Sequence, residues 1–410
     1  MNRNCLSLGL LSASACLFLF HSGWAAAQPV PLGAETRVDT AEGKQPNEPA
    51  LAVQPGGDFE IAWGYLDVSP PFVAARHFAA DGAPTDATQV SLGAWGPYPR
   101  VKSVTATQGG FEVLWQLEGT YRVPSYRRHL DLDGKPAPGK PVRLGKGVWW
   151  VWQVRGHGFL GGWPTQTNGL ASGLSIQRLS PTTGQVTGSV VRLNTRPIFS
   201  VERPLLTALA DGGFLAVWTG VARVGNDYGM VLRARRFSAA GKPVGPDFDV
   251  DSVPEGAQDA LHYPKVAASP AGGFAVAWRF FDAFSGTDNV STPYVRLFDA
   301  AGRPRGPEIA GAVTQYVEAL AFDDAGNLLV LWADDSTRGP ADLEVQVLGP
   351  DGAPLGPQTR LASEASGAFT RPVQGSAAWG GSSWIVTWVA DNEANLPRPR
   401  AIFVRRFAGE

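Results

Sequence analysis

The segments Gly212-Gly213-Phe214-Leu215-Ala216-Val217-Trp218 and Gly272-Gly273-Phe274-Ala275-Val276-Ala277-Trp278 are two copies of the motif that decides the fold of this 410-residue chain. In each copy a glycine-rich turn precedes an aromatic residue, which opens an alternating strand that ends in tryptophan. The motif occurs seven times, and its final tryptophans are Trp63, Trp115, Trp163, Trp218, Trp278, Trp332 and Trp388. Successive tryptophans are 48 to 60 residues apart, an interval that suits a repeat of four short strands.

A second motif follows the tryptophan, and it consists of a strand, a turn with glycine and a last strand that begins near proline. Arg235-Arg236-Phe237 with Gly241-Lys242-Pro243 is one copy, and Gln346-Val347-Leu348 with Gly352-Ala353-Pro354 is another. Glycine permits positive φ in a hairpin, and proline is tolerated on an outer edge strand because it lacks an amide donor. No segment shows a sustained apolar period of 3.6 residues, so we expect few helices. The repeats therefore predict an all-β fold, a seven-bladed β-propeller with four-stranded antiparallel blades.

The seventh repeat is incomplete, because the chain ends at Phe407-Ala408-Gly409-Glu410, before a fourth strand. The missing piece is present near the other end of the chain. Pro31-Leu32-Gly33-Ala34-Glu35-Thr36-Arg37-Val38 matches Pro354-Leu355-Gly356-Pro357-Gln358-Thr359-Arg360-Leu361 almost position for position. We therefore predict that this N-terminal strand is the outer strand of the last blade and closes the ring by hydrogen bonds.

The two motifs together resemble the GGF-x-V-x-W and R-x-F-x-x-x-G-x-P-x-G blades of bacterial secreted or periplasmic seven-bladed β-propeller repeat proteins. The resemblance covers essentially the whole chain after residue 27. It implies the architecture and says little about function, because propellers serve as enzymes, lectin-like binders and scaffolds.

The first 27 residues are typical of a cleaved signal peptide. Arg3 supplies a positive charge, Leu6 to Phe20 is an apolar run too short for a comfortable membrane span, and Ala25-Ala26-Ala27 fits a cleavage site. We expect cleavage after Ala27, which leaves a single propeller domain over residues 28–410 in the periplasm or outside the cell. We favour this over lipoprotein anchoring at Cys16, since leucine is missing three residues before that cysteine. Cys5 and Cys16 are the only cysteines, so the exported chain has no disulfide and no thiolate site.

Composition and motifs exclude several function classes. The formal net charge of −2 gives no basic face for nucleic acid or an anionic membrane. The sequence has no H-E-x-x-H, Walker loop, G-x-S-x-G or EF-hand pattern, so we expect no metal and no cofactor. We expect a monomer.

The connections of irregular length all lie on one face of the predicted ring, where long loops on a rigid scaffold usually carry recognition. The innermost strands begin on that face at comparable positions, often before proline, and these positions hold Glu48, Tyr98, Trp149, Arg203, Tyr263, Glu318 and Arg371. Arginine binds carboxylates and aromatic faces stack on sugar rings, so this ring suits a carboxylate-bearing or sugar ligand. A self-neutralising charge ring that solvates the channel mouth is the alternative. The seven tryptophans fit inter-blade core better than a binding site.

The sequence leaves two candidate functions. The first is an exported, non-catalytic binding propeller with a carbohydrate or protein ligand at the channel mouth. The second is a polysaccharide lyase or glycoside hydrolase that uses His262, Tyr263 and channel-mouth arginine or glutamate residues. In a lyase, His262 and Tyr263 transfer protons while Arg203 or Arg371 neutralises a substrate carboxylate. His262 falls in a long connection, whereas His77 and His129 share a strand register and His157 lies in a tight turn.

Overall fold

The computed structural model of the chain describes residues 29–40, 44–93, 98–117, 124–145, 147–167, 170–224, 227–251, 260–281, 291–312, 315–334, 343–361, 371–391 and 400–409. All the regular secondary structure in these ranges is β-strand, so they include no helix that could cross a membrane. The strands form seven antiparallel sheets, one for each repeat, which confirms the predicted β-propeller.

The blades are numbered in chain order. Blade 1 contains β2 (Pro46–Val53), β3 (Phe59–Tyr65), β4 (Phe72–Phe78) and β5 (Val90–Gly93), and blade 2 contains β6 (Pro99–Thr107), β7 (Gly110–Leu117), β8 (Ser125–Leu130) and β9 (Val142–Leu144). Blade 3 contains β10 (Trp150–Val154), β11 (Gly158–Thr167), β12 (Leu170–Leu179) and β13 (Val186–Arg192). Blade 4 contains β14 (Ser200–Val201), β15 (Leu205–Ala208), β16 (Phe214–Val224), β17 (Asp227–Phe237) and β18 (Pro243–Asp249), with the innermost strand split into β14 and β15.

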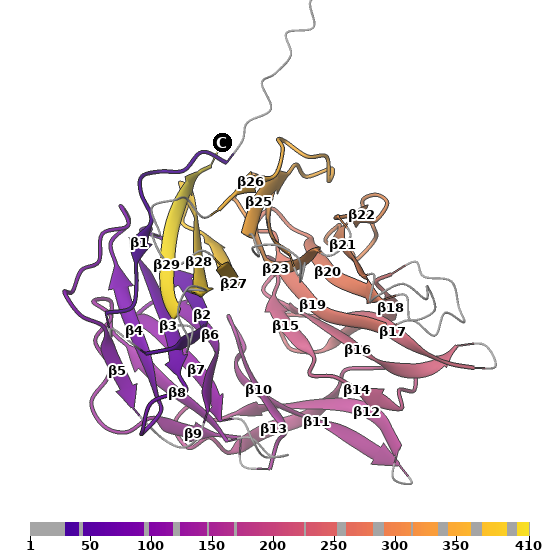
Figure 1. Cartoon of the computed structure of the whole chain (residues 1–410). Helices are drawn as coiled ribbons and strands as arrows, with labels where there is room; N and C mark the ends of the chain where they lie inside the picture. The colour runs from indigo at the N-terminus through magenta and orange to yellow at the C-terminus, as the bar shows by residue number, and fades with distance from the viewer. Residues whose placement is uncertain are drawn as a thin grey trace, which may run out of the picture.

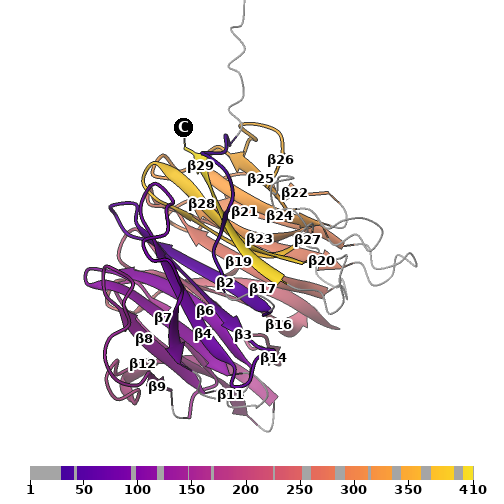
Figure 2. The same cartoon turned by 60° about the vertical axis from the view of Figure 1, so that its left-hand side comes forward.

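Blade 5 contains β19 (Ala260–Ala268), β20 (Phe274–Phe281), β21 (Ser291–Phe298) and β22 (Ile309–Ala310), and blade 6 contains β23 (Gln315–Phe322), β24 (Leu328–Asp334), β25 (Leu343–Leu348) and β26 (Thr359–Arg360). Blade 7 contains β27 (Arg371–Trp379), β28 (Ser383–Asp391), β29 (Arg400–Ala408) and β1 (Thr36–Arg37). The innermost strands β2, β6, β10, β15, β19, β23 and β27 contact one another in that order, and β27 returns to β2. Figures 1 and 2 show the result, with the indigo strands of blade 1 beside the yellow strands of blade 7.

The ring closes as predicted, because β1 pairs with β29 and completes blade 7. Thr36 lies opposite Val404, and Pro31 bridges Phe407. Blade 6 has the same register, with Thr359 opposite Val345 and Pro354 bridging Leu348. The sequence match between the two segments is therefore a match of ladder positions, and the closing strand occupies the place that β26 has in its own blade.

The tryptophans that end the second strands lie between blades, as predicted. Six of the seven are buried, and Trp163 of blade 3 is half-buried. Trp63 and Ile61 of blade 1, for example, pack in one cluster with Ile385 and Val389 of blade 7. These side chains bury the apolar faces of neighbouring sheets, so they belong to the core rather than to a binding surface.

An arginine on the third strand joins each of five blades to the blade before it. We call this residue the third-strand arginine. It lies two positions before an aromatic or leucine residue at or next to the end of the strand. The five residues and the backbone oxygens that accept their hydrogen bonds are Arg76 with Val38 (2.9 Å), Arg128 with Leu92 (2.8 Å), Arg235 with Leu193 (3.2 Å), Arg296 with Val250 (2.8 Å) and Arg405 with Leu361 (3.3 Å). Blades 3 and 6 have Gln177 and Gln346 instead, which donate to oxygens of their own blades.

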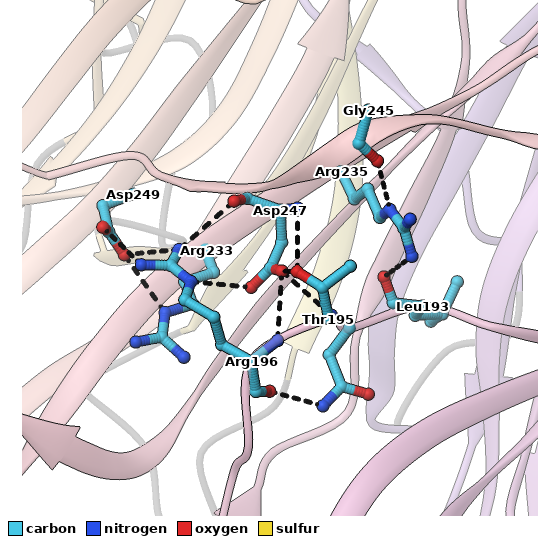
Figure 3. A network of polar contacts seen from close by, with 9 residues as sticks. Leu193, Thr195, Arg196, Arg233, Arg235, Gly245, Asp247 and Asp249 are labelled. Carbon is cyan, nitrogen blue, oxygen red and sulfur yellow. Dashed lines mark hydrogen bonds and ion pairs between the residues drawn. The ribbon is translucent and has the colours of Figure 1, made fainter.

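Blades 3 and 4 share a further polar network, shown in Figure 3. Asp247 has a fully buried side chain, and it accepts hydrogen bonds from the backbone nitrogens of Thr195 (2.9 Å) and Arg196 (3.3 Å). The Arg196 guanidinium then binds Asp249 through two hydrogen bonds of 2.8 and 2.9 Å. The segment that enters blade 4 is thus held to the outer strand of that blade.

Candidate functional site

Five of the seven predicted channel-mouth residues lie at one level of the ring, beside the tryptophan of the adjacent strand. A bulge places Glu48 and Pro49 opposite Trp63, and another places Tyr263 and Pro264 opposite Trp278. Arg203, Trp149 and Glu318 take the corresponding places in blades 4, 3 and 6.

Tyr98 and Arg371 lie farther out, near the start of their strands. Pro99, which follows Tyr98, pairs with Leu117, and Arg371 pairs with Asp391. In blade 2 the bulge falls at Lys102, which therefore takes the level of Glu318. Tyr98 and Arg371 differ from the other five residues because the number of residues between the proline and the bulge varies between blades.

Three residues of this mouth have an unusual backbone conformation. Glu48, Tyr98 and Tyr263 have φ values of 47°, 51° and 54°, and they are the non-glycine residues with positive φ in the described part of the chain. This region costs an L-residue roughly 1–2 kcal/mol, and such residues often mark functional sites. Tyr98 and Tyr263 are 55% and 66% exposed. The fold thus presents two phenol rings at the mouth on the long-loop face.

The two predicted glutamates are held by cations. Glu48 pairs with Arg100 and, at 3.8 Å, with Lys102. Glu318 lies 3.4 Å from Lys265. Burial raises the pKa of Glu318, and the charge and hydrogen bond of Lys265 act against that rise.

Arg203 is held by hydrogen bonds to residues of blades 2 and 3. Its guanidinium donates to Gln116 Oε1 at 3.1 Å and to the backbone oxygen of Val151 at 2.9 Å. Burial lowers the pKa of Arg203 to about 10, and the charge of Glu48 acts against the fall. Glu48 belongs to blade 1 and Arg203 to blade 4, three positions apart in the ring.

A cavity of about 490 Å³ fills this part of the channel, and we call it the cationic cavity. Among the lining residues that the structure describes, the charged side chains are Lys102, Arg203 and Lys265, and none is a carboxylate. Ser103 also lines the cavity, and its buried hydroxyl has no hydrogen-bond partner among the described residues. The arrangement can neutralise an anion and hydrogen-bond to it.

The proposed catalytic grouping stays a prediction. His262 lies in β19 opposite Arg279, in a strand rather than in a loop. The side chains of His262 and Arg371 fall outside the described residues, so only Tyr263 and Arg203 of that grouping are placed. The other histidines have structural partners, since His77 contacts Glu60, His129 contacts Glu112 and His157 contacts the Gly212 backbone oxygen. In the part of the chain that the structure covers, no group of three or more His, Cys, Asp or Glu side chains could hold a metal ion.

Lys102 and Lys265 were not predicted as site residues. Each comes soon after the proline that marks the strand start, and bulges decide which of these positions faces the channel. The sequence signal was a lysine one residue after Pro264 in blade 5 and three residues after Pro99 in blade 2.

No protein-family model matches the sequence, and no curated protein matches it. Solved structures do resemble the fold. A protein of unknown function from Dyadobacter fermentans superimposes with a TM-score of 0.50 and 11% identity over 93% of this chain and 99% of its own. An α-L-arabinanase from Penicillium chrysogenum gives a TM-score of 0.49 and 13% identity over 91% and 98%, and an α-L-arabinofuranosidase from Fusarium graminearum gives 0.46 and 12% over 91% and 97%. At these identities the likeness extends to the fold alone.

Proposed function

We propose that the protein is a non-catalytic binding propeller for an acidic carbohydrate, which enters the channel from the long-loop face. The observation that carries the proposal is the cationic cavity, in which Lys102, Arg203 and Lys265 come from three different blades. Cations gathered around a part-enclosed space favour a carboxylate-bearing ligand, because low-dielectric walls strengthen the attraction. The predicted signal peptide supports export, so we propose that binding takes place in the periplasm or outside the cell, by a monomer.

The surroundings of the cavity agree with a sugar ligand. Tyr98 and Tyr263 offer exposed rings at the mouth, and an aromatic face can stack on a sugar ring. Ser103 offers a hydroxyl without a partner among the described residues. Glu48 and Glu318 are both bound to lysine or arginine, which suits a role in holding the cations in place.

The test is a titration of the chain without its predicted leader (residues 28–410) with trigalacturonate, followed by calorimetry at low and high salt. We expect binding that weakens with salt, and we expect Lys265→Gln to weaken it about tenfold, which is about 1.4 kcal/mol. Lys242→Gln is the matched control, because Lys242 is an exposed lysine in an outer turn. Binding that is absent, or that survives Lys265→Gln unchanged, would contradict the proposal.

A glycoside hydrolase or lyase is the second candidate, and the raised pKa of Glu318 is the observation that favours it. A carboxyl group with a raised pKa can act as a general acid, and a second carboxylate is then required nearby. A reducing-end assay on the same acidic oligosaccharides separates the candidates. Turnover that Glu318→Gln abolishes favours a hydrolase, turnover that His262→Ala or Tyr263→Phe abolishes favours a lyase, and binding without turnover favours the binding propeller.

A further inference from the structure

A second and larger cavity lies at the other end of the channel, on the face of the tight Gly-Gly turns. It has a volume of about 1020 Å³, and we call it the tight-turn cavity. Its lining comes from six blades and includes Gln54, Thr105, Gln108, Gln153, Asp324 and Trp379. Gln153 also lines the cationic cavity, so the two spaces follow one another along the channel.

The repeats allow the lining to be compared blade by blade. In each innermost strand, one residue pairs with the aromatic or leucine residue that follows the tight turn of the blade. In blade order these residues are Val53, Ala106, Gln153, Ala208, Ala268, Phe322 and Trp379. Five of them are apolar residues no larger than phenylalanine. Gln153 is polar and Trp379 is larger, so these two differ from the other five. Blades 3 and 7 are three positions apart in the ring, so the two departures face the cavity from opposing walls.

Trp379 is held firmly while its ring stays partly exposed. Its indole Nε1 donates to Asp324 Oδ2 at 2.9 Å, and Trp384 lies edge-on at 5.0 Å. Gly409 lies against the six-membered ring, where an added Cβ would come within 2.1 Å of the Trp379 Cη2 atom. A ring fixed by three contacts loses little conformational freedom when a ligand stacks on it.

Gln153 supplies an acceptor to the opposite wall. Its Oε1 atom is buried and has no hydrogen-bond partner among the described residues. A buried acceptor without a partner is unfavourable, so a ligand hydroxyl that donates to it would be favoured.

The charges of the tight-turn cavity balance, in contrast to those of the cationic cavity. Arg155 and Asp324 are the charged side chains among its lining residues. Amides, hydroxyls, one carboxylate and one indole ring are the groups that recognise a neutral, hydroxyl-rich molecule.

We propose that the tight-turn cavity is a separate binding site for a neutral saccharide. Trp379 stacks on a sugar ring, while Asp324 and Gln153 hydrogen-bond to its hydroxyl groups. This site goes beyond the function proposed above, because it lies at the opposite mouth and takes an uncharged ligand.

The experiment is saturation-transfer NMR followed by calorimetry on residues 28–410, with maltotriose, cellotriose, xylotriose and arabinotriose as probes. We expect at least one probe to bind, with little dependence on salt. Trp379→Ala should weaken that binding at least tenfold. Alanine already occupies this ladder position in blades 2, 4 and 5, so the repeat itself tolerates the change.

Two variants serve as controls. Asp211→Asn alters a tight-turn carboxylate of blade 4 that is not part of the cavity lining, and Lys265→Gln alters the cationic cavity. Both should leave neutral-saccharide binding unchanged. If Trp379→Ala has a much lower melting temperature than the parent chain, Asp324→Asn and Gln153→Ala provide the test instead. Each should weaken the binding of the neutral saccharide.

The inference is overturned if none of the four probes binds, or if the variants that fold bind as tightly as the parent. Because these probes carry no charge, the outcome is independent of the trigalacturonate titration.

Discussion

At the scale of single residues, the buried contact between Glu60 and His77 couples the stability of the ring to pH. His77 Nδ1 lies 3.1 Å from Glu60 Oε2, and both side chains are buried. Gly134 of blade 2 covers the pair, since an added Cβ there would lie 2.6 Å from the His77 Cβ atom. Burial raises the pKa of Glu60 to about 7, although the hydrogen bond to His77 acts against it. Burial by itself would lower the pKa of His77, but the hydrogen bond and charge of Glu60 raise it.

The raised pKa values of Glu60 and His77 therefore change the free energy of unfolding in the same direction as pH rises. The folded pKa of each group exceeds its unfolded value, so the folded chain binds more protons, and the stabilisation is lost as pH rises. For Glu60 the loss falls between the ordinary value of 4.5 and about 7. We predict that the free energy of unfolding of the parent chain, minus that of Glu60→Gln, decreases from pH 5 to pH 8 in urea denaturation.

Blade 2 offers a matched control, because His129 and Glu112 form the same contact at 3.1 Å with side chains that are 35% and 13% exposed. Glu112→Gln removes the same kind of contact at a more exposed site, where Arg127 also pairs with Glu112 at 2.9 Å, and its unfolding is measured in parallel. Parallel profiles for the parent and Glu60→Gln would refute the coupling.

Part of the candidate site could be predicted from single residues of the sequence. The equal register of His77 and His129 indicated structural residues, and both contact the glutamate that faces them across the ladder. Glu48 and Tyr263, which were predicted as residues before proline, lie beside the tryptophan of the adjacent strand. Lys265 and Trp379 were not predicted as site residues. Whether they face the channel depends on the bulge and on the backbone geometry at the tight-turn end of the channel. The alternation of apolar residues does not encode either feature.

At the scale of the strands, the third-strand arginine explains a motif that hydrophobic patterning leaves unexplained. Arg76 is buried and also stacks over Phe78, at 5.7 Å from the ring centre. Its guanidinium donates to the backbone oxygens of Val38 and Asp86, at 2.9 and 3.0 Å. The arginine thus supplies donors to a backbone oxygen after the outer strand of blade 7 and to one between β4 and β5 of its own blade.

Arg76→Gln tests this role with a residue that blades 3 and 6 have at the same position. We expect a loss of about 2 kcal/mol in the free energy of unfolding, because charge-assisted hydrogen bonds between blades disappear. Arg305→Gln is the comparison, since Arg305 is exposed and its hydrogen bonds are 3.4 Å long. Equal unfolding midpoints in urea for Arg76→Gln and Arg305→Gln would show that the contact between blades does not matter for stability.

At the scale of the whole molecule, the fold was predictable because each repeat encodes its own turns. Gly212 and Gly352 adopt φ values of 79° and 85° in the two kinds of tight turn, a conformation that glycine permits. The seven-fold recurrence of these turns fixed the number of blades, and the match of Pro31–Val38 to blade 6 fixed the closure. The long-loop face could not be predicted in the same way, since its connections share no pattern from one blade to the next.

Ring closure by β1 should dominate the stability of the whole chain. Val38 is fully buried, Leu32 N donates to Arg406 O at 2.8 Å, and Asp39 Oδ1 accepts from Ile402 N at 2.7 Å. A chain that starts at residue 41 loses these contacts together with the acceptor of Arg76. We predict that its melting temperature falls by about 10 °C relative to residues 28–410, as measured by circular dichroism.

A circular permutation distinguishes loss of the strand from mere shortening. In blade 6, residues 350–352 separate Gly349 from Ala353, and Gly349 N donates to Ala353 O. In blade 7, Ala408 N donates to Val30 O in the same way, and Gly409 and Glu410 supply two of the three intervening residues. A chain that starts at residue 41 and continues from Glu410 through one added glycine into residues 30–40 therefore reproduces the blade 6 turn, with the glycine at the place of Gly352. It should recover the melting temperature that truncation removes, whereas a permuted chain as unstable as the truncated one would show that β1 does not close the ring.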